Sequence, residues 1–288
     1  MRLAFIGFGE VGYYFARDLA GSGLEITAYR RRRELAEARA RETRVRLCAT
    51  LGEALDGAEV VLSCVWPHSA LEAARDAAPF LRPGQLYGDL NSTSPGTAQR
   101  IYEALAGTGA GFAKLAIMAG VTESEGKTPI IAGGPDAARL AKLMNGWGMN
   151  VRVFGEDVRA PAAFKIARAY GLKAILAASY EMARVARRYA IEEEVLASAG
   201  EMLGWTGYGK RMSDWIASTA VHAGRRAQEM DEAVETITDV GLDPQFAHAI
   251  RRVFEGIAAS GLREVLPVAV PGIFSALMVG LGRAVGET

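Results

Sequence analysis

Short apolar runs alternate with amphipathic stretches through the first half of the chain. Five runs have the length and residue types of buried strands, at residues 3–6, 24–29, 45–47, 60–65 and 86–90. Helical spacing appears between them, over residues 11–20 and 33–41. Strands that alternate with helical stretches are typical of βαβ units, so the pattern predicts a parallel sheet. The third run is short, and Gly88 weakens the fifth.

The second half of the chain has a different pattern. From residue 160 onward, long stretches rich in Ala, Leu and Glu have helical spacing and contain few β-branched runs. Pro161 suits the first turn of a helix, and residues 161–190 hold no further proline. One long helix is therefore expected to connect the halves. We place the boundary near residue 158, with an α/β domain over 1–158 and an all-α domain over 159–288.

The composition is that of a globular protein of 288 residues, with half of them apolar and 23% charged. Lys and Arg (33) balance Asp and Glu (33), so no overall basic field exists to hold a nucleic acid or an anionic membrane. Two cysteines and three scattered histidines offer neither a disulfide framework nor a metal site. We expect no metal and no nucleic-acid partner.

The N-terminal stretch and residues 265–282 are the two segments that could indicate secretion or a membrane span. We expect no secretory signal at the N-terminus, because Glu10 cuts its apolar stretch short and no cleavage site follows. Residues 265–282 carry no charge, close to the length of a membrane span. Two prolines and two glycines interrupt this stretch, which favours a buried core segment or a subunit contact. The sequence thus predicts a cytoplasmic protein without a membrane partner.

A glycine loop follows the first predicted strand. The stretch Gly7-Phe8-Gly9-Glu10-Val11-Gly12 has the pattern G-x-G-x-x-G and opens the first predicted helix. The first glycine permits a tight turn, the second lets the backbone approach a pyrophosphate, and the third lets helix and strand pack closely. The helix N-terminus attracts the anion. We therefore predict a dinucleotide site here; the alternative is a glycine-rich turn without a ligand.

A basic cluster follows the second predicted strand. Tyr29 ends that strand, and Arg30, Arg31 and Arg32 come next. NAD-selecting folds place a carboxylate at this point to bind the ribose 2′-hydroxyl, and none is present here. Guanidinium groups match the geometry of a phosphate, so the cluster favours NADP over NAD. The alternative is a solvated helix start, which places cations unfavourably in the helix dipole.

At this point the chain resembles the β-hydroxyacid dehydrogenase family, which also contains 6-phosphogluconate dehydrogenase and the imine reductases. Residues 89–95 resemble the family's D-x-S-T-x-x-P motif, with Asn91 and Ser92 in place of the Ser-Thr pair. Residues 115–120 stand where the family has a strand that ends in S-G-G, and Lys165 matches the family's catalytic lysine.

The resemblance implies a doubly wound Rossmann-type domain, a helical C-terminal domain and a homodimer built through those helices. It implies that Lys165 exchanges a proton with a substrate hydroxyl while hydride passes to the nicotinamide, a role that suits a positioned ammonium. It assigns the cofactor-contact loop to Val65-Trp66-Pro67, where Trp66 either walls the nicotinamide or fills core. Asn91 and Ser92 become substrate candidates together with Ala119 and Gly120. Asn91 and Ser92 also suit a turn before Pro95, and Lys165 also suits an exposed helix face.

The chain departs from the family pattern at three places. The family has asparagine four residues after the lysine, where this chain has Ala169. The S-G-G turn is Met118-Ala119-Gly120, and a later family lysine falls on Gln228. These changes make the usual small 3-hydroxy acids doubtful and suggest a bulkier or differently charged substrate.

Three functions are compatible with these features. An NADP-dependent dehydrogenase that acts on a hydroxyl substrate through Lys165 is the leading hypothesis. An imine reductase is the nearest alternative, although the retained lysine favours oxygen chemistry. A non-catalytic NADPH-binding regulatory protein is the third. The sequence names neither the substrate nor the direction of the reaction.

Overall fold

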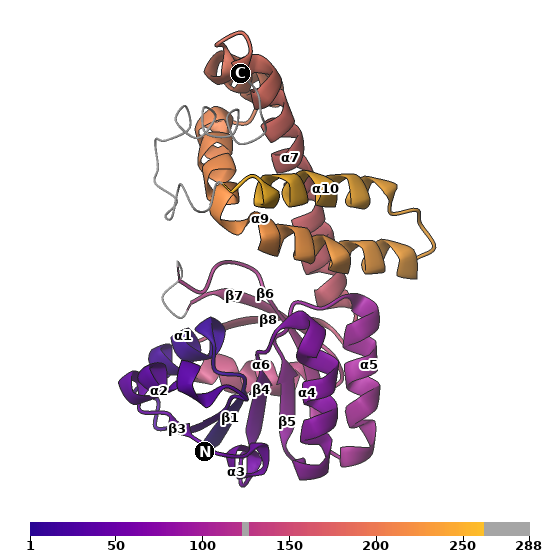
Figure 1. The fold of residues 1–288 in the computed structure, drawn as a ribbon. Coiled ribbons are helices and arrows are strands. Elements are labelled where there is room, and N and C mark those ends of the chain that lie inside the picture. The colour runs from indigo at the N-terminus through magenta and orange to yellow at the C-terminus, as the bar shows by residue number, and fades with distance from the viewer. Residues whose placement is uncertain (123–126, 262–288) are drawn as a thin grey trace. The chain divides into compact units, whose positions relative to one another are not determined.

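The computed structural model describes residues 1–122 and 127–261, and the described residues divide into two compact units between Ile166 and Ala167. The first unit is an α/β domain and the second is helical (Figure 1), which confirms the predicted fold class. The division at residue 166 lies within one helix, and the boundary predicted near residue 158 lies just before that helix begins. Residues 265–282 lie outside the described residues.

The first unit is built on a sheet whose strand order is β3-β2-β1-β4-β5-β6-β7-β8. The strands are β1 (Arg2–Ile6), β2 (Glu25–Tyr29), β3 (Arg46–Leu47), β4 (Val60–Ser63), β5 (Leu86–Asp89), β6 (Gly111–Ile117), β7 (Pro129–Gly133) and β8 (Asn150–Gly155). All pairs from β3 to β6 are parallel, and so is β7 with β8, whereas β6 pairs with β7 antiparallel. The order reverses between β1 and β4, which is where doubly wound sheets bind nucleotides.

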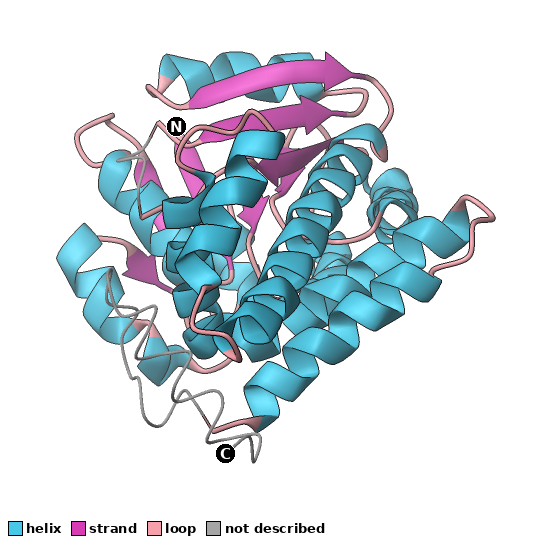
Figure 2. Cartoon of the chain, turned by 90° about the horizontal axis from the view of Figure 1, so that it is seen from above, coloured by secondary structure: helices cyan, strands magenta, loops and turns pink. Residues whose placement is uncertain are grey.

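Helices cover both faces of this sheet (Figure 2), and side chains alternate between two cores. Leu3 and Phe5 of β1 face one core, and Ala4 and Ile6 face the other. The helices of this unit are α1 (Glu10–Asp18), α2 (Glu37–Thr43), α3 (Leu51–Leu55), α4 (Ala70–Ala77), α5 (Pro95–Leu105) and α6 (Ala137–Gly146). Burial on both faces explains why the central strands β1 and β4 are nearly continuous apolar runs without polar alternation.

The structure differs from the predicted pattern of helices and strands in several places. Residues 33–41 form no single helix: a 3₁₀ turn (Arg33–Leu35) precedes α2, and the buried Ala36 separates them. The strands β7 and β8 were missed, and with them the antiparallel step in a sheet predicted to be parallel. β8 is an edge strand and mostly exposed, so it carries little of the apolar signal on which the prediction rested.

The second unit contains the remainder of α7 (Ala160–Arg187), then α8 (Glu192–Met202), α9 (Tyr208–Asp239) and α10 (Gln245–Ala259). The long helix predicted from residue 161 is therefore present, with Pro161 in its first turn. Among the described residues, no helix is both long and apolar enough to cross a membrane.

Close packing in the interior of the sheet leaves no room for a side chain at Gly88 in β5. A Cβ atom at this position would approach the methyl groups of Leu62, Leu115 and Leu140 to between 2.7 and 3.0 Å. Overpacking of this kind costs about 1–3 kcal/mol, so we expect Gly88→Val to lower the free energy of unfolding by that amount in urea titrations. Gly107→Val is the control, because in the described part of the chain no atom beyond its neighbours in sequence lies within 4 Å of a Cβ there. Equal stability of the two variants would contradict the packing argument.

Candidate functional site

The glycine loop joins β1 to α1 at the carboxyl edge of the sheet. Gly7 has a φ of +86°, and its amide donates to the carbonyl of Tyr29 at 2.9 Å. A Cβ on Gly7 would lie 2.6 Å from the carbonyl oxygen of Cys64. The Cys64 thiol donates to the Gly7 carbonyl at 3.0 Å, and burial raises the pKa of this thiol to about 12, so it stays a neutral donor. The predicted tight turn is confirmed, and packing against the end of β4 fixes it.

The other two glycines of the loop have different surroundings. Gly12 is buried in α1, where a Cβ would lie 3.0 Å from the Phe8 ring and 3.2 Å from the Gly7 carbonyl oxygen. Around Gly9, no atom of the described residues apart from its two chain neighbours lies within 4 Å of the position a Cβ would take. Gly9 is also the N-cap of α1, and its cap lacks a side-chain hydrogen bond. The protein itself leaves room at Gly9 beside the positive end of a helix dipole, as a bound pyrophosphate requires.

The structure separates the arginines of the basic cluster. The Arg30 guanidinium donates to the carbonyl of Phe8 at 3.1 Å, so it lies against the glycine loop. Burial, with Arg39 and Arg32 nearby, lowers the pKa of Arg30. Arg31 turns away and pairs with Glu72 at 2.8 Å and with an aspartate of α4 at 3.0 Å. Arg32 is exposed.

Arg39 is a member of this cluster that the sequence analysis missed. Its guanidinium carbon lies 5.7 Å from the ring centroid of Tyr13, one turn into α1. Its charge also lowers the pKa of Arg30, so the two guanidinium groups are near enough to repel one another. The spacing along α2 gave no signal, because Arg39 comes near Tyr13 and Arg30 only through the fold.

The loop after β4 presents an exposed aromatic side chain. Trp66 is 61% exposed and stacks on His68 with ring centroids 6.5 Å apart, and Pro67 starts a 3₁₀ turn. Trp66 therefore does not fill core. Val65 donates its amide to the Asn91 side chain at 2.7 Å, which joins this loop to the one after β5.

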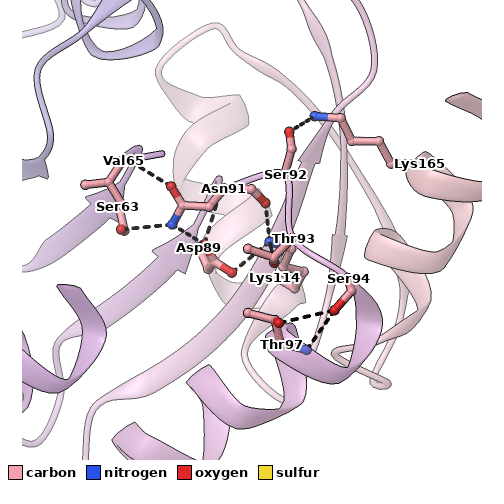
Figure 3. A network of polar contacts seen from close by, with 10 residues as sticks. All are labelled: Ser63, Val65, Asp89, Asn91, Ser92, Thr93, Ser94, Thr97, Lys114 and Lys165. Carbon is pink, nitrogen blue, oxygen red and sulfur yellow. Dashed lines mark hydrogen bonds and ion pairs between the residues drawn. The ribbon is translucent and has the colours of Figure 1, made fainter. Parts of the chain in front are cut away.

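Asn91 holds the ends of two strands together (Figure 3). Its side-chain oxygen accepts from Val65, and its side-chain nitrogen donates to Ser63 Oγ at 3.1 Å and to Asp89 Oδ1 at 2.6 Å. Asn91 is 4% exposed. Both ends of its amide are thus used within the protein, and its predicted contact with a substrate stays a prediction.

A buried ion pair lies beneath the same loop. Lys114 of β6 donates to Asp89 Oδ2 at 2.7 Å, and these side chains are 1% and 0% exposed. The same ammonium donates to the carbonyl oxygen of Asn91 and to Thr93 Oγ1 at 3.2 Å. The carboxyl end of β5 and the loop after it are thereby joined to the middle of β6.

Ser92 meets the predicted catalytic lysine. Lys165, in the second turn of α7, donates from Nζ to Ser92 Oγ at 2.6 Å (Figure 3). Both residues are half-buried, and both belong to the first unit. Ala119 and Gly120 follow β6, the neighbour of β5, and are exposed. Ala169 lies one turn beyond Lys165, in the second unit, and carries no polar group in place of the family's asparagine.

These contacts place the predicted residues along one edge of the sheet. The glycine loop follows β1 and Ser92 follows β5, two strands away and thus separated by about 10 Å across the sheet. This edge offers an open helix N-terminus, guanidinium groups, and an ammonium paired with a hydroxyl. Within the described part of the chain, no group of acidic, histidine and cysteine side chains could hold a metal.

The residue that replaces the later family lysine belongs to the second unit. Beside Gln228, Glu229 of α9 pairs with Lys173 and with Arg225, each at 2.7 Å. Although burial opposes ionisation, the nearby cations hold the pKa of Glu229 below its usual value. This carboxylate is satisfied within its own unit.

Comparison with known proteins identifies the family of the first unit. Residues 2–155 match the family described as the NAD binding domain of 6-phosphogluconate dehydrogenase, and residues 186–257 match a domain of unknown function. A curated but uncharacterised 28.5 kDa protein of Methanothermus fervidus is 26% identical over 261 residues, which cover 89% of this chain and 99% of the relative.

Two solved structures are similar over nearly the whole chain. One, a conserved hypothetical protein from Sinorhizobium meliloti 1021, is 29% identical, with a TM-score of 0.79 over 99% of this chain and 96% of the other. The second, a conserved protein of unknown function described as similar to 3-hydroxyacid dehydrogenases, is 31% identical. Its TM-score is 0.77, over 92% of this chain and 98% of the other.

The contrast between Gly7 and Gly9 is testable. We expect Gly7→Ala to lower the free energy of unfolding by about 1–3 kcal/mol, because alanine is strained at this φ and meets the Cys64 carbonyl. We expect Gly9→Ala to leave stability within about 0.5 kcal/mol, because the protein has room there. The same change should weaken NADPH binding more than tenfold, or about 1.4 kcal/mol, in calorimetry. Unchanged binding in Gly9→Ala would show that no ligand approaches this position.

Proposed function

Since the chain belongs to the family of the NAD binding domain of 6-phosphogluconate dehydrogenase, we propose that it is an NADP-dependent oxidoreductase. The reaction transfers a hydride between the nicotinamide and a carbon that bears the substrate hydroxyl. The observation that carries the proposal is the hydrogen bond from Lys165 Nζ to Ser92 Oγ, at the sheet edge that holds the glycine loop. The substrate is a hydroxyacid or another alcohol.

The glycine loop and the arginines would hold the cofactor. The space at Gly9 admits the pyrophosphate to the N-terminus of α1. Arg30 and Arg32 supply guanidinium groups for the 2′-phosphate, and no carboxylate stands at the end of β2 to repel it. When bound, the nicotinamide supplies the acceptor or donor of the hydride.

Lys165 moves the proton. In oxidation, the neutral amine accepts the proton of the substrate hydroxyl as the carbon–hydrogen bond yields its hydride. In reduction, the ammonium donates the proton to the forming alkoxide oxygen. The hydroxyl of Ser92 accepts a hydrogen bond from Nζ and holds the amino group in place, which preserves its orientation through the transfer.

We also propose that the protein acts as a homodimer through its helical unit. Large apolar side chains are exposed on this unit, at Val185, Tyr189, Met202, Leu203, Val240, Leu242 and Phe246. A cavity of about 460 Å³ opens between α7 and α10, lined in part by Tyr180 and Ile250. Exposed apolar surface of this kind favours a protein contact.

The proton-transfer role is tested by Lys165→Met. A panel of hydroxy compounds with NADP, and of cyclic imines with NADPH, first identifies a substrate. We then expect the variant to lose about 10²- to 10⁴-fold in kcat, the range of general acid–base catalysis, with the Kd for NADPH unchanged. Lys142→Met, on the exposed side of α6, is the matched control. Turnover of imines alone would favour an imine reductase, and NADPH binding without any turnover would favour a regulatory protein.

The preference for NADP is tested by Arg32→Gln. Loss of a charged hydrogen bond to the 2′-phosphate should weaken NADPH binding about tenfold and leave NADH binding unchanged. Calorimetry with both cofactors measures the difference. Arg139→Gln is the control, because this exposed arginine donates to the carbonyl of Gly84, remote from the glycine loop. An equal loss for both cofactors would mean that Arg32 does not contact the 2′-phosphate.

A further inference from the structure

Lys114 is a buried lysine to which the proposed reaction assigns no part. It stands opposite Asp89 in the register of β5 and β6, and both side chains are removed from water. Transfer of an ammonium and a carboxylate out of water costs several kcal/mol each, and an apolar pair of similar volume is often as stable or more so. Stability alone is therefore a weak reason for this pair.

Two of the hydrogen bonds of Lys114 are made to the residues that flank Ser92. Its ammonium donates to the carbonyl oxygen of Asn91 and to the hydroxyl of Thr93, the residues on either side of Ser92. Its bond to Asp89 fixes the ammonium itself at 2.7 Å. Ser92 is thus flanked by a backbone carbonyl, of Asn91, and a side-chain hydroxyl, of Thr93, that both accept from one ammonium in the sheet.

Asn91 fixes the same segment from another direction. Asp89 accepts from the Asn91 amide at 3.0 Å and from its side chain, whose oxygen accepts from Val65. The two residues on either side of Ser92, Asn91 and Thr93, are therefore held by the ends of β4 and β5 and by the middle of β6. Ser92 itself forms none of these bonds, and its hydroxyl meets Lys165.

We propose that Lys114 is a positioning residue for the reaction. Its ammonium fixes the loop at Asn91 and Thr93 so that the Ser92 hydroxyl stands where it orients Lys165, and Asp89 serves to hold that ammonium in the sheet. This inference rests on the proposed function of Lys165 and goes beyond it, since Lys114 touches neither Ser92 Oγ nor Lys165 in the contacts above.

The test uses a variant in which no unpaired charge is buried. Lys114→Met alone would leave the buried Asp89 carboxylate without its cationic partner. The Asp89→Asn/Lys114→Met double variant is therefore the informative one. We expect this double variant to unfold near the wild-type temperature and to bind NADPH with an unchanged Kd. We expect its kcat to fall about 100-fold, because a displacement of about 1 Å in a catalytic group costs that much. Wild-type kcat in the double variant would overturn the proposal, since neutralising Asp89 would then be the only task of Lys114.

A second comparison asks whether the effect passes through Ser92. In a Ser92→Ala background, the two substitutions at Asp89 and Lys114 should add no further loss of kcat, because the group they position is already gone. Losses that multiply would overturn the proposal. Lys142→Met again controls for the introduction of methionine.

Hydrogen–deuterium exchange separates this inference from the proposed function. In the Asp89→Asn/Lys114→Met variant, the amides of residues 91–94 should exchange faster than in the wild type, while those of the glycine loop should not change. If the amides of residues 91–94 exchange faster in the double variant but the wild-type protein oxidises no hydroxy compound, the proposed function is wrong and Lys114 still holds the loop around Ser92. If the exchange rates of residues 91–94 do not change, Lys114 does not hold this loop, and the inference is wrong regardless of the measured activity.

Discussion

The site depends on one electrostatic constraint: an ammonium removed from water must have all of its hydrogen bonds made for it. Lys114 has three acceptors, and each lies on or beside the loop after β5. Because a buried cation without acceptors is costly, the loop is held where its oxygen atoms can serve the lysine. The position of Ser92 follows from this arrangement, and with it the position of the Lys165 amino group.

The sheet topology brings these groups to one place. Parallel strands end on the same edge, so the loops after β1, β4 and β5 meet there although they are far apart in the sequence. The Cys64 thiol ties the β4 end to the glycine loop, and the Asn91 amide ties it to the loop after β5. The glycine loop and the loop that carries Ser92 are therefore linked through the end of β4.

Much of this arrangement could be predicted from local patterns. The strands from β1 to β5, the glycine loop and the family itself were correctly identified, because apolar runs and the spacing of glycines are signals of short range. Arg39 and Lys114 were missed, because each acquires its neighbours only through the fold. Asp89 lies 25 residues before Lys114, and nothing in either segment alone indicates that they pair. The roles of Arg30 and Arg31 were indistinguishable in sequence, since the acidic partners of Arg31 belong to a distant helix.

The Asp89–Lys114 pair also bears on how the chain finds its fold. Both strands of this pair have side chains that alternate between two apolar cores, so neighbouring registers differ little in hydrophobic burial. A slip of β6 by one residue would set Ala113 or Leu115 against Asp89 and turn the lysine into the opposite core, where it meets leucine and methionine side chains. A sheet with β6 shifted by one residue would therefore bury an unpaired ammonium, which raises its free energy. The charge pair thus favours the native register over its neighbours during folding.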